Sequence, residues 1–186
     1  MKKSYIGLVI LIILIVLTGS FISSRNNMVK SSEEVDAKYA NIDVQLKRRA
    51  DLIPNLISTV KGYMSHEEKI INSITEARSN LVNAKSLTDK AKANDKLTES
   101  LNSLNVIVEN YPDLKANTNF IELQDELSGT ENRISNARRE YNEAVKSYNQ
   151  MISVFPGSIV ASIFKFEKKQ YFEASESDTG VPNVEF

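Results

Sequence analysis

The chain opens with a long apolar stretch, which is followed by a series of amphipathic helical patterns. Residues 4 to 24 carry no charge, and the apolar run gives candidate span ends at Tyr5 and Ile22. A helix needs about 20 apolar residues to cross the hydrocarbon core of a bilayer, where it satisfies its own backbone polar groups. The pattern predicts a single-pass transmembrane helix in contact with the lipid bilayer, with residues 1–27 forming the membrane anchor and a short linker.

A cleaved signal peptide is the alternative interpretation of the same stretch. Lys2 and Lys3 precede the apolar run, and Thr18 and Ser20 supply the small residues that come before a cleavage site. Cleavage after Ser20 would release a secreted or periplasmic helical binding module. Attachment through a lipid-modified Cys is excluded, because Ser20 stands where that Cys would be needed.

Four amphipathic patterns follow the apolar stretch. In the first and last, apolar positions alternate at spacings of three and four residues, which is typical of helices that pack like coiled coils. In the first pattern Arg49 fills one position of the apolar stripe. The patterns cover residues 28–61, 70–84, 97–111 and 120–155.

Short connections between long helices favour antiparallel neighbours. We therefore expect an all-α fold in which residues 28–157 form an antiparallel four-helix bundle. Residues 158–186 are expected to form a capping segment with a short C-terminal helix, followed by an irregular acidic tail. In the segment "FPGSIVASIFKF" the short helix either caps the open end of the bundle or lies on lipid headgroups. In the tail, Val181, Val184 and Phe186 are placed to dock on the bundle or on a partner.

Helix ends are indicated by capping residues. Gly62 is expected to take the left-handed conformation after the first helix. The pairs Ser65 with Glu68, Ser86 with Asp89, and Asn119 with Glu122 have the spacing of N-terminal caps. The alternative to a break near Ser86 is one continuous helix through the second and third patterns.

Pro54 lies inside the first apolar stripe and predicts a kink. Proline removes one backbone donor and clashes with the carbonyl four residues earlier, which here belongs to Ala50. Because the apolar register is the same on both sides of Pro54, we expect a bend and no chain reversal. The freed Ala50 carbonyl is expected to accept a hydrogen bond from water or from a nearby Arg.

Aligning the first and last helices predicts three polar contacts between them. Matching Tyr63 with Phe120 brings three charged residues of the first helix near residues of opposite sign on the last helix. For Arg49 the alternative is a side chain that reaches past the apolar stripe to water. The predicted pairs are Arg49 with Glu131, Asp51 with Arg133, and Asp43 with Arg139.

Composition disfavours several classes of site. The chain of 186 residues has 23 Lys and Arg against 24 Asp and Glu, one His and no Cys, so a nucleic-acid partner is not expected. His66 is followed by two Glu, but Ile70 stands where a His-Glu-x-x-His zinc motif needs its second His. Glycine-rich phosphate loops are missing as well. We therefore expect no catalytic, metal or cofactor-binding residues and no small-molecule substrate. The remaining alternative is a hydrolase that uses His66 or Arg49.

Several ordered blocks resemble the LemA family of bacterial membrane proteins. These blocks are "IDVQLKRRADLIPNLISTVKGY", "YPDLKANTNFIELQDELSGTENRISNARREYNEAVKSYN" and "FPGSIVASIFKFEKKQYFEA" followed by "VPNVEF". The likeness covers residues 35–186. It implies a bromodomain-like four-helix bundle, a mirror variant of the up-and-down topology, behind one N-terminal span. At position 50 this chain has Ala where the family usually has an aromatic residue.

Together these patterns favour a non-catalytic membrane-tethered scaffold or adaptor at the bacterial cell envelope, with a protein partner that the sequence does not identify. Charges flanking the span slightly favour a cytoplasmic amino end and an external bundle. The family resemblance implies the opposite orientation, with the bundle in the cytoplasm. Both orientations stay open at the level of sequence.

Overall fold

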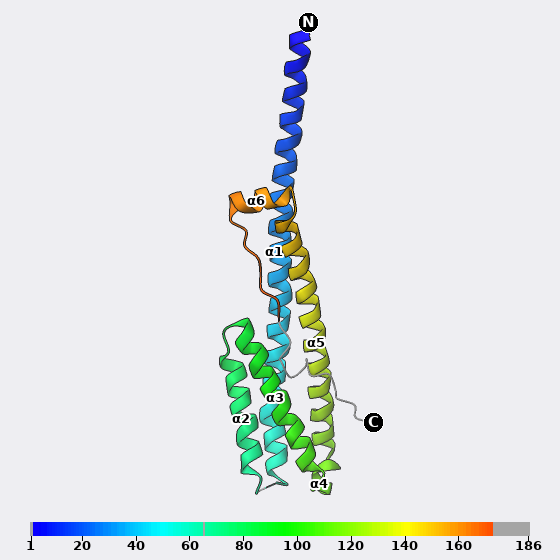
Figure 1. The fold of residues 1–186 in the computed structure, drawn as a ribbon. Helices are drawn as coiled ribbons and strands as arrows, with labels where there is room; N and C mark the ends of the chain where they lie inside the picture. Colours follow the sequence, from blue (N-terminus) through cyan, green and yellow to red (C-terminus); the bar gives the residue numbers. More distant parts are fainter. Residues whose placement is uncertain (1, 65, 173–186) are drawn as a thin grey trace, which may run out of the picture. The chain divides into compact units, whose positions relative to one another are not determined.

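The computed structural model describes residues 2–64 and 66–172, and this part of the chain is all-helical with no strand. The predicted all-α fold class is therefore confirmed. A long N-terminal apolar helix comes first and five further helices follow it (Figure 1). The helices are α1 (Lys2–Lys61), α2 (Glu68–Asn83), α3 (Leu87–Val108), α4 (Pro112–Lys115), α5 (Thr118–Ser153) and α6 (Gly157–Phe164).

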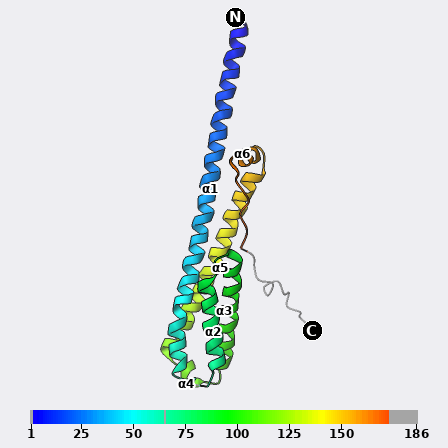
Figure 2. The ribbon, with the colours of Figure 1, turned by 90° about the vertical axis from the view of Figure 1, so that its left-hand side faces the viewer.

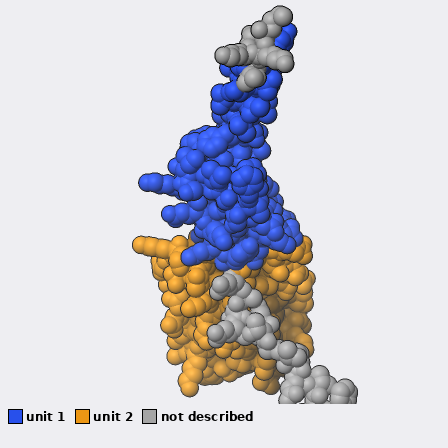
Figure 3. Space-filling model, turned by 45° about the horizontal axis from the view of Figure 1, so that its top comes forward, with its two compact units in different colours: residues 1–39, 140–171 blue, residues 40–139, 172–186 orange. Residues whose placement is uncertain are grey.

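The chain divides into two compact units (Figure 3). Unit 1 comprises residues 1–39 and 140–171, and unit 2 comprises residues 40–139 and 172–186. Helices α1 and α5 contribute residues to both units. The two units are defined by packing alone. The domain boundaries expected from the sequence, with a bundle from residue 28 and a capping segment from residue 158, stay predictions.

The described part of unit 2 contains four long helical segments whose chain direction alternates, and the short α4. The last part of α1 runs towards the α1–α2 corner, α2 runs back, α3 returns to α4, and the first part of α5 runs back again (Figure 2). Each segment turns its apolar positions inward, so the buried residues recur at helical spacing. Among the least exposed of these core side chains are Ile42, Ile53, Leu56, Ile74, Leu97, Leu104 and Ile134.

Unit 1 is built from α1, the end of α5, α6 and an extended segment. The rings of Tyr39 and Tyr141 lie with centroids 6.1 Å apart. The extended segment is fixed to α5 by Asn149, whose side chain donates to the Lys169 carbonyl and accepts from the Lys169 N–H, both at 2.9 Å. The Tyr141 hydroxyl donates to the Gln170 carbonyl at 2.9 Å.

The predicted break between the second and third patterns is confirmed. Ser86 is the N-cap of α3, and its hydroxyl accepts a hydrogen bond from the Asp89 N–H at 3.0 Å. Two helices therefore replace the alternative of one continuous helix. A serine cap of this kind satisfies a backbone donor that has no partner within the helix.

Other helix ends differ from the predictions. Gly62 does not take a left-handed conformation, because no glycine in the described structure has a positive φ. The N-cap of α2 is Glu67, and the predicted cap residue Ser65 lies outside the described residues. Helix α5 begins at Thr118, where Asn117 accepts from the Phe120 N–H at 3.0 Å, so the cap lies two residues before the predicted Asn119.

The register between α1 and α5 differs by about one helical turn from the predicted alignment. In unit 2, Asn117 donates to the Tyr63 hydroxyl at 2.9 Å, so Asn117 takes the place predicted for Phe120. In unit 1, Tyr39 meets Tyr141, where the prediction gave Ala144. A seven-residue apolar pattern repeats its seam nearly every turn, so sliding one helix by three or four residues leaves the seam apolar. Periodicity alone therefore does not fix the register.

Candidate interhelical polar site

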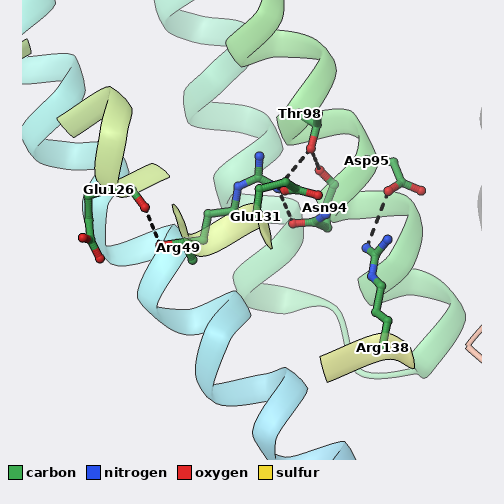
Figure 4. Close-up of polar contacts among 8 residues, drawn as sticks. Arg49, Asn94, Asp95, Thr98, Glu126, Glu131 and Arg138 are labelled. Atoms are coloured by element: carbon green, nitrogen blue, oxygen red, sulfur yellow. Dashed lines mark hydrogen bonds and ion pairs between the residues drawn. The ribbon is translucent and has the colours of Figure 1, made fainter. Parts of the chain in front are cut away.

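Arg49 lies within the apolar stripe of α1 and is 3% exposed. Its Nη1 donates to Asn94 Oδ1 at 2.6 Å and to Thr98 Oγ1 at 3.0 Å, both on α3 (Figure 4). The same nitrogen forms an ion pair with a carboxylate oxygen of Glu131 on α5. One guanidinium group therefore connects three helices of unit 2.

The electrostatics of this cluster follow from burial. Burial lowers the pKa of the Arg49 guanidinium, and the charge of Glu131 opposes this shift. Arginine nevertheless remains protonated in proteins, so a buried charge has to be matched by acceptors. Glu131, Asn94 and Thr98 supply these acceptors. A buried ion pair of this type adds little net stability compared with apolar packing, and its best-attested role is to fix alignment.

Further ion pairs surround Arg49 on the same helices. Arg138 on α5 lies 3.6 Å from Asp95 on α3, and its guanidinium carbon lies 4.5 Å above the Phe172 ring. Glu126 accepts from Arg48 at 2.6 Å and from Arg133 at 3.2 Å. We call the set of Arg48, Arg49, Asn94, Asp95, Thr98, Glu126, Glu131, Arg133 and Arg138 the polar seam.

The structure brings together one of the three predicted pairs. Arg49 meets Glu131, as described above. Asp43 instead binds Lys90 of α3 through both carboxylate oxygens at 2.7 Å, while Arg139 donates to Asn136 on its own helix.

Arg133, predicted to face Asp51, contacts Glu126 one heptad away on α5. The pairs Asp43 with Arg139 and Asp51 with Arg133 are therefore corrected. Two causes account for them: the register differs by one turn, and Asp43 faces α3.

Pro54 lies in the uninterrupted helix α1, as the unbroken register predicts. The expected Arg partner of the Ala50 carbonyl is also confirmed: Arg78 of α2 donates from Nε to Ala50 O at 2.8 Å. The sequence indicated this acceptor but not which arginine would reach it. The kink at Pro54 stays a prediction.

A cleft of about 240 Å³ lies beside Arg49 and Glu131 between α3 and α5. Its wall is rich in amide side chains, which donate and accept hydrogen bonds without carrying charge. Sequence reasoning missed these residues because isolated Asn and Gln on helix surfaces carry no spacing signal. They are Asn102, Asn105, Gln124 and Asn132.

The only histidine is exposed and lies in the turn before α2, as predicted. Among residues 2–64 and 66–172, side chains of His, Asp and Glu do not gather in groups of three that would hold a metal ion. The chemistry of the polar seam is that of ion pairing and hydrogen bonding between helices. Its charged groups hold one another, and the cleft beside them offers uncharged polar contacts.

The N-terminal part of α1 is long and apolar enough to cross a membrane, with a mean hydropathy of 2.5 in its most apolar window. The predicted span ends, Tyr5 and Ile22, both lie within this helix, which continues beyond each of them. Its large apolar side chains from Leu8 to Leu17 are all more than half exposed. These side chains therefore face the surroundings of the molecule and not its core.

Comparison with known proteins identifies relatives of this chain in sequence. The family model described as LemA family matches residues 38–186. Protein LemA of Metamycoplasma hominis is 27% identical over 157 residues, which cover 84% of this chain and 72% of the relative. Magnetosome protein MamQ 2 of Paramagnetospirillum magneticum is 25% identical, with 80% of this chain and 64% of the relative covered. Magnetosome protein MamQ of Magnetospirillum gryphiswaldense is 26% identical, with 84% of this chain and 67% of the relative covered. Since the family match spans well over half of its residues, the chain belongs to the LemA family.

Proposed function

We propose that the protein is a non-catalytic scaffold or adaptor, anchored in a bacterial cell membrane by a single helix. The observation that carries the proposal is the exposed apolar part of α1, where side chains from Leu8 to Leu17 lack any cover. Leaving such a surface in water is unfavourable by about 25 cal/mol for each Å². A lipid environment removes that cost, and the residues from Tyr5 to Ile22 span about 27 Å as a helix.

The scaffold part of the proposal rests on the polar seam. Its arginines are paired with carboxylates and amides, so the seam fixes helices in place. A general base or nucleophile needs a titratable group near a reacting centre, and the histidine of this chain is exposed in a turn. The relatives also differ in name, since two are called magnetosome proteins and one is called Protein LemA. Such a difference in name within one family supports an adaptor more than a single shared reaction.

Two variants test the anchor. Ile12→Asp with Ile13→Asp places two carboxylates in the middle of the span, where each costs about 2.5–3.5 kcal/mol. The wild-type chain is expected in the membrane fraction after a high-salt wash, and the double variant is expected in the soluble fraction. Val44→Asp with Val106→Asp is the matched control, because both valines are exposed in unit 2. A wild-type chain that washes off with salt contradicts the proposal.

Crosslinking in intact cells tests the scaffold role. A photo-crosslinking residue replaces Asn105 or Asn132 at the amide-rich cleft, and Lys69 on α2 serves as an exposed control. A defined protein crosslinked from the cleft and not from α2 supports an adaptor. Identical background from all three positions contradicts a partner at this surface.

A further inference from the structure

One exposed apolar surface of unit 1 is not accounted for by the anchor or the polar seam. Helix α6 has the sequence GSIVASIF, which contains no charge. Its inner face is buried through Gly157, Val160 and Ala161. Its outer face is exposed through Ile159 and Ile163, and Val154 and Phe155 just before the helix are exposed as well. We call Val154, Phe155, Ile159 and Ile163, which are each 51–79% exposed, the α6 patch.

Helix α6 lies crosswise to α1, as the two views of the ribbon agree (Figures 1 and 2). At its N-terminus Gly157 approaches Met28 so closely that an added Cβ would lie 3.1 Å from Met28 Cε. At its C-terminus the Phe164 ring lies 5.8 Å from the Phe21 ring, and the Arg25 guanidinium carbon lies 5.1 Å from the Phe164 centroid. Helix α6 therefore packs on α1 between Phe21 and Met28.

This position coincides with the end of the apolar span. Ile22 closes the span, and Phe21 and Arg25 are the residues that contact Phe164. With a rise of 1.5 Å per residue, the stretch from Ile22 to Met28 covers about 9 Å along α1. The headgroup region on one side of a bilayer is of similar thickness. A helix crosswise to the span at this level lies parallel to the membrane surface.

Basic residues gather at the C-terminal end of α6, where they can attract anionic headgroups. Arg25 contacts Phe164 at this end. The exposed Lys165 and Lys168 follow in the chain, with Glu167 as the acidic residue between them. Aromatic rings at Phe21 and Phe164 suit the boundary between headgroups and acyl chains. A protein partner would need a surface complementary to the patch, and nothing in the described part of unit 1 indicates one. The bilayer that surrounds the proposed span, by contrast, already reaches the level of α6.

We propose that α6 lies in the headgroup region of the bilayer, with the α6 patch inserted at the boundary with the acyl chains. This inference rests on the proposed membrane anchor and adds a second contact with the same membrane. The bilayer then covers the outer face of α6, and the anchor and α6 together hold unit 1 at the lipid surface.

The chain has no cysteine, so single-cysteine variants of the full chain carry a fluorophore at one defined place. The labelled variants are I159C and I163C in the patch and L14C in the span. The variant E143C, an exposed residue of α5 in the same unit, serves as the control. Each protein is reconstituted into two sets of vesicles of zwitterionic and anionic phospholipids. One set carries a quencher near the top of the acyl chain, for the patch labels and the E143C label, and the other carries a quencher near the end of the acyl chain, for the L14C label.

The inference predicts that quenching of the I159C and I163C labels exceeds that of the E143C label at least about threefold. Quenching equal to that of E143C overturns the inference. If the L14C label is quenched and the patch labels are not, the anchor holds and the α6 contact fails. If L14C is also unquenched, the proposed anchor itself fails. Shielded patch labels that lipid does not quench indicate a second copy of the chain and also overturn the inference.

Discussion

At the scale of single residues, Arg49 shows how one charge can fix a helix alignment. It lies in an apolar stripe between Leu46 and Ile53. Apolar packing alone would allow several alignments of the neighbouring helices at this stripe. The Arg49 guanidinium donates to Asn94 and Thr98 and forms an ion pair with Glu131. Because the charge is buried, an alignment that separates it from these acceptors is strongly unfavourable. The cluster therefore selects one register among those that the apolar pattern permits.

A double-mutant cycle on Arg49→Met and Glu131→Gln tests this role. Both residues belong to one polar network, so we expect a coupling free energy of about 1–3 kcal/mol. The measurement is denaturant-induced unfolding of the full chain in detergent micelles. The control cycle uses Arg48→Met and Glu126→Gln, whose arginine is more than half exposed, and coupling there is expected to be below about 1 kcal/mol. Equal coupling in the two cycles contradicts the role given to Arg49.

Pro54 and Arg78 provide a second test at this scale. Arg78→Met leaves the Ala50 carbonyl without its donor, which is expected to cost about 1–3 kcal/mol. In a Pro54→Ala background the new N–H of residue 54 can reach the same carbonyl, so the cost of Arg78→Met is expected to fall. Unfolding of the four proteins measures the difference. An unchanged cost in the Pro54→Ala background rules out the compensation.

At the scale of elements, the sequence predicted where the helices lie better than how they align. The stripes of α1 and α5 were predictable because residues such as Ile42 and Ile134 repeat at helical spacing and are buried. The break at Ser86 was predictable because a serine cap has a local signature. The start of α5 was not, because Asn117 and Asn119 both resemble a cap, and in the structure Asn117 caps the helix. The difference in register explains why Asp43 and Asp51 received wrong partners.

The packing of α6 on unit 1 depends on Gly157. A Cβ at this position would lie 2.3 Å from the Met151 carbonyl oxygen, and this atom belongs to the backbone. Gly157→Ala is therefore expected to destabilise the protein by about 1–3 kcal/mol, as overpacking does. Gly19→Ala is the control, since nothing lies within 4 Å of its added Cβ. Thermal unfolding of both variants is the measurement, and equal midpoints count against the close packing of α6.

The extended segment after α6 gives a prediction for pH. Burial raises the pKa of Tyr141, and the nearby Tyr39 and Asp36 act in the same direction. A raised pKa means that the fold favours the neutral phenol. Its contribution to stability is complete below the usual tyrosine pKa of about 10 and is lost as pH rises through the raised value.

We therefore expect the free energy of unfolding to fall above about pH 10 less steeply in Tyr141→Phe than in the wild type. Burial also raises the pKa of Tyr148, so some alkaline dependence is expected to persist in the variant. Unfolding titrations of both proteins on either side of about pH 10 give the two slopes. If the free energy of unfolding falls with the same slope in both proteins, Tyr141 is not a source of the loss of stability at alkaline pH.

At the scale of the whole molecule, two compact units share the long helices α1 and α5. The family match begins at residue 38, close to the start of unit 2, and extends to the end of the chain. The apolar part of α1 lies before the match, so its role rests on its own composition and exposure. The sequence predicted that role from an uncharged run, but the same run also fits a cleaved leader. Physical reasoning from pattern alone does not separate these two outcomes, because both require an apolar helix.

The most direct test of the account is the mass of the protein isolated from cells. The chain is expressed in a bacterial host, the membrane and soluble fractions are separated, and intact mass is measured in each. The account predicts the full chain of 20.9 kDa in the membrane fraction. A soluble species that begins after Ser20 would contradict it and would establish the released module instead.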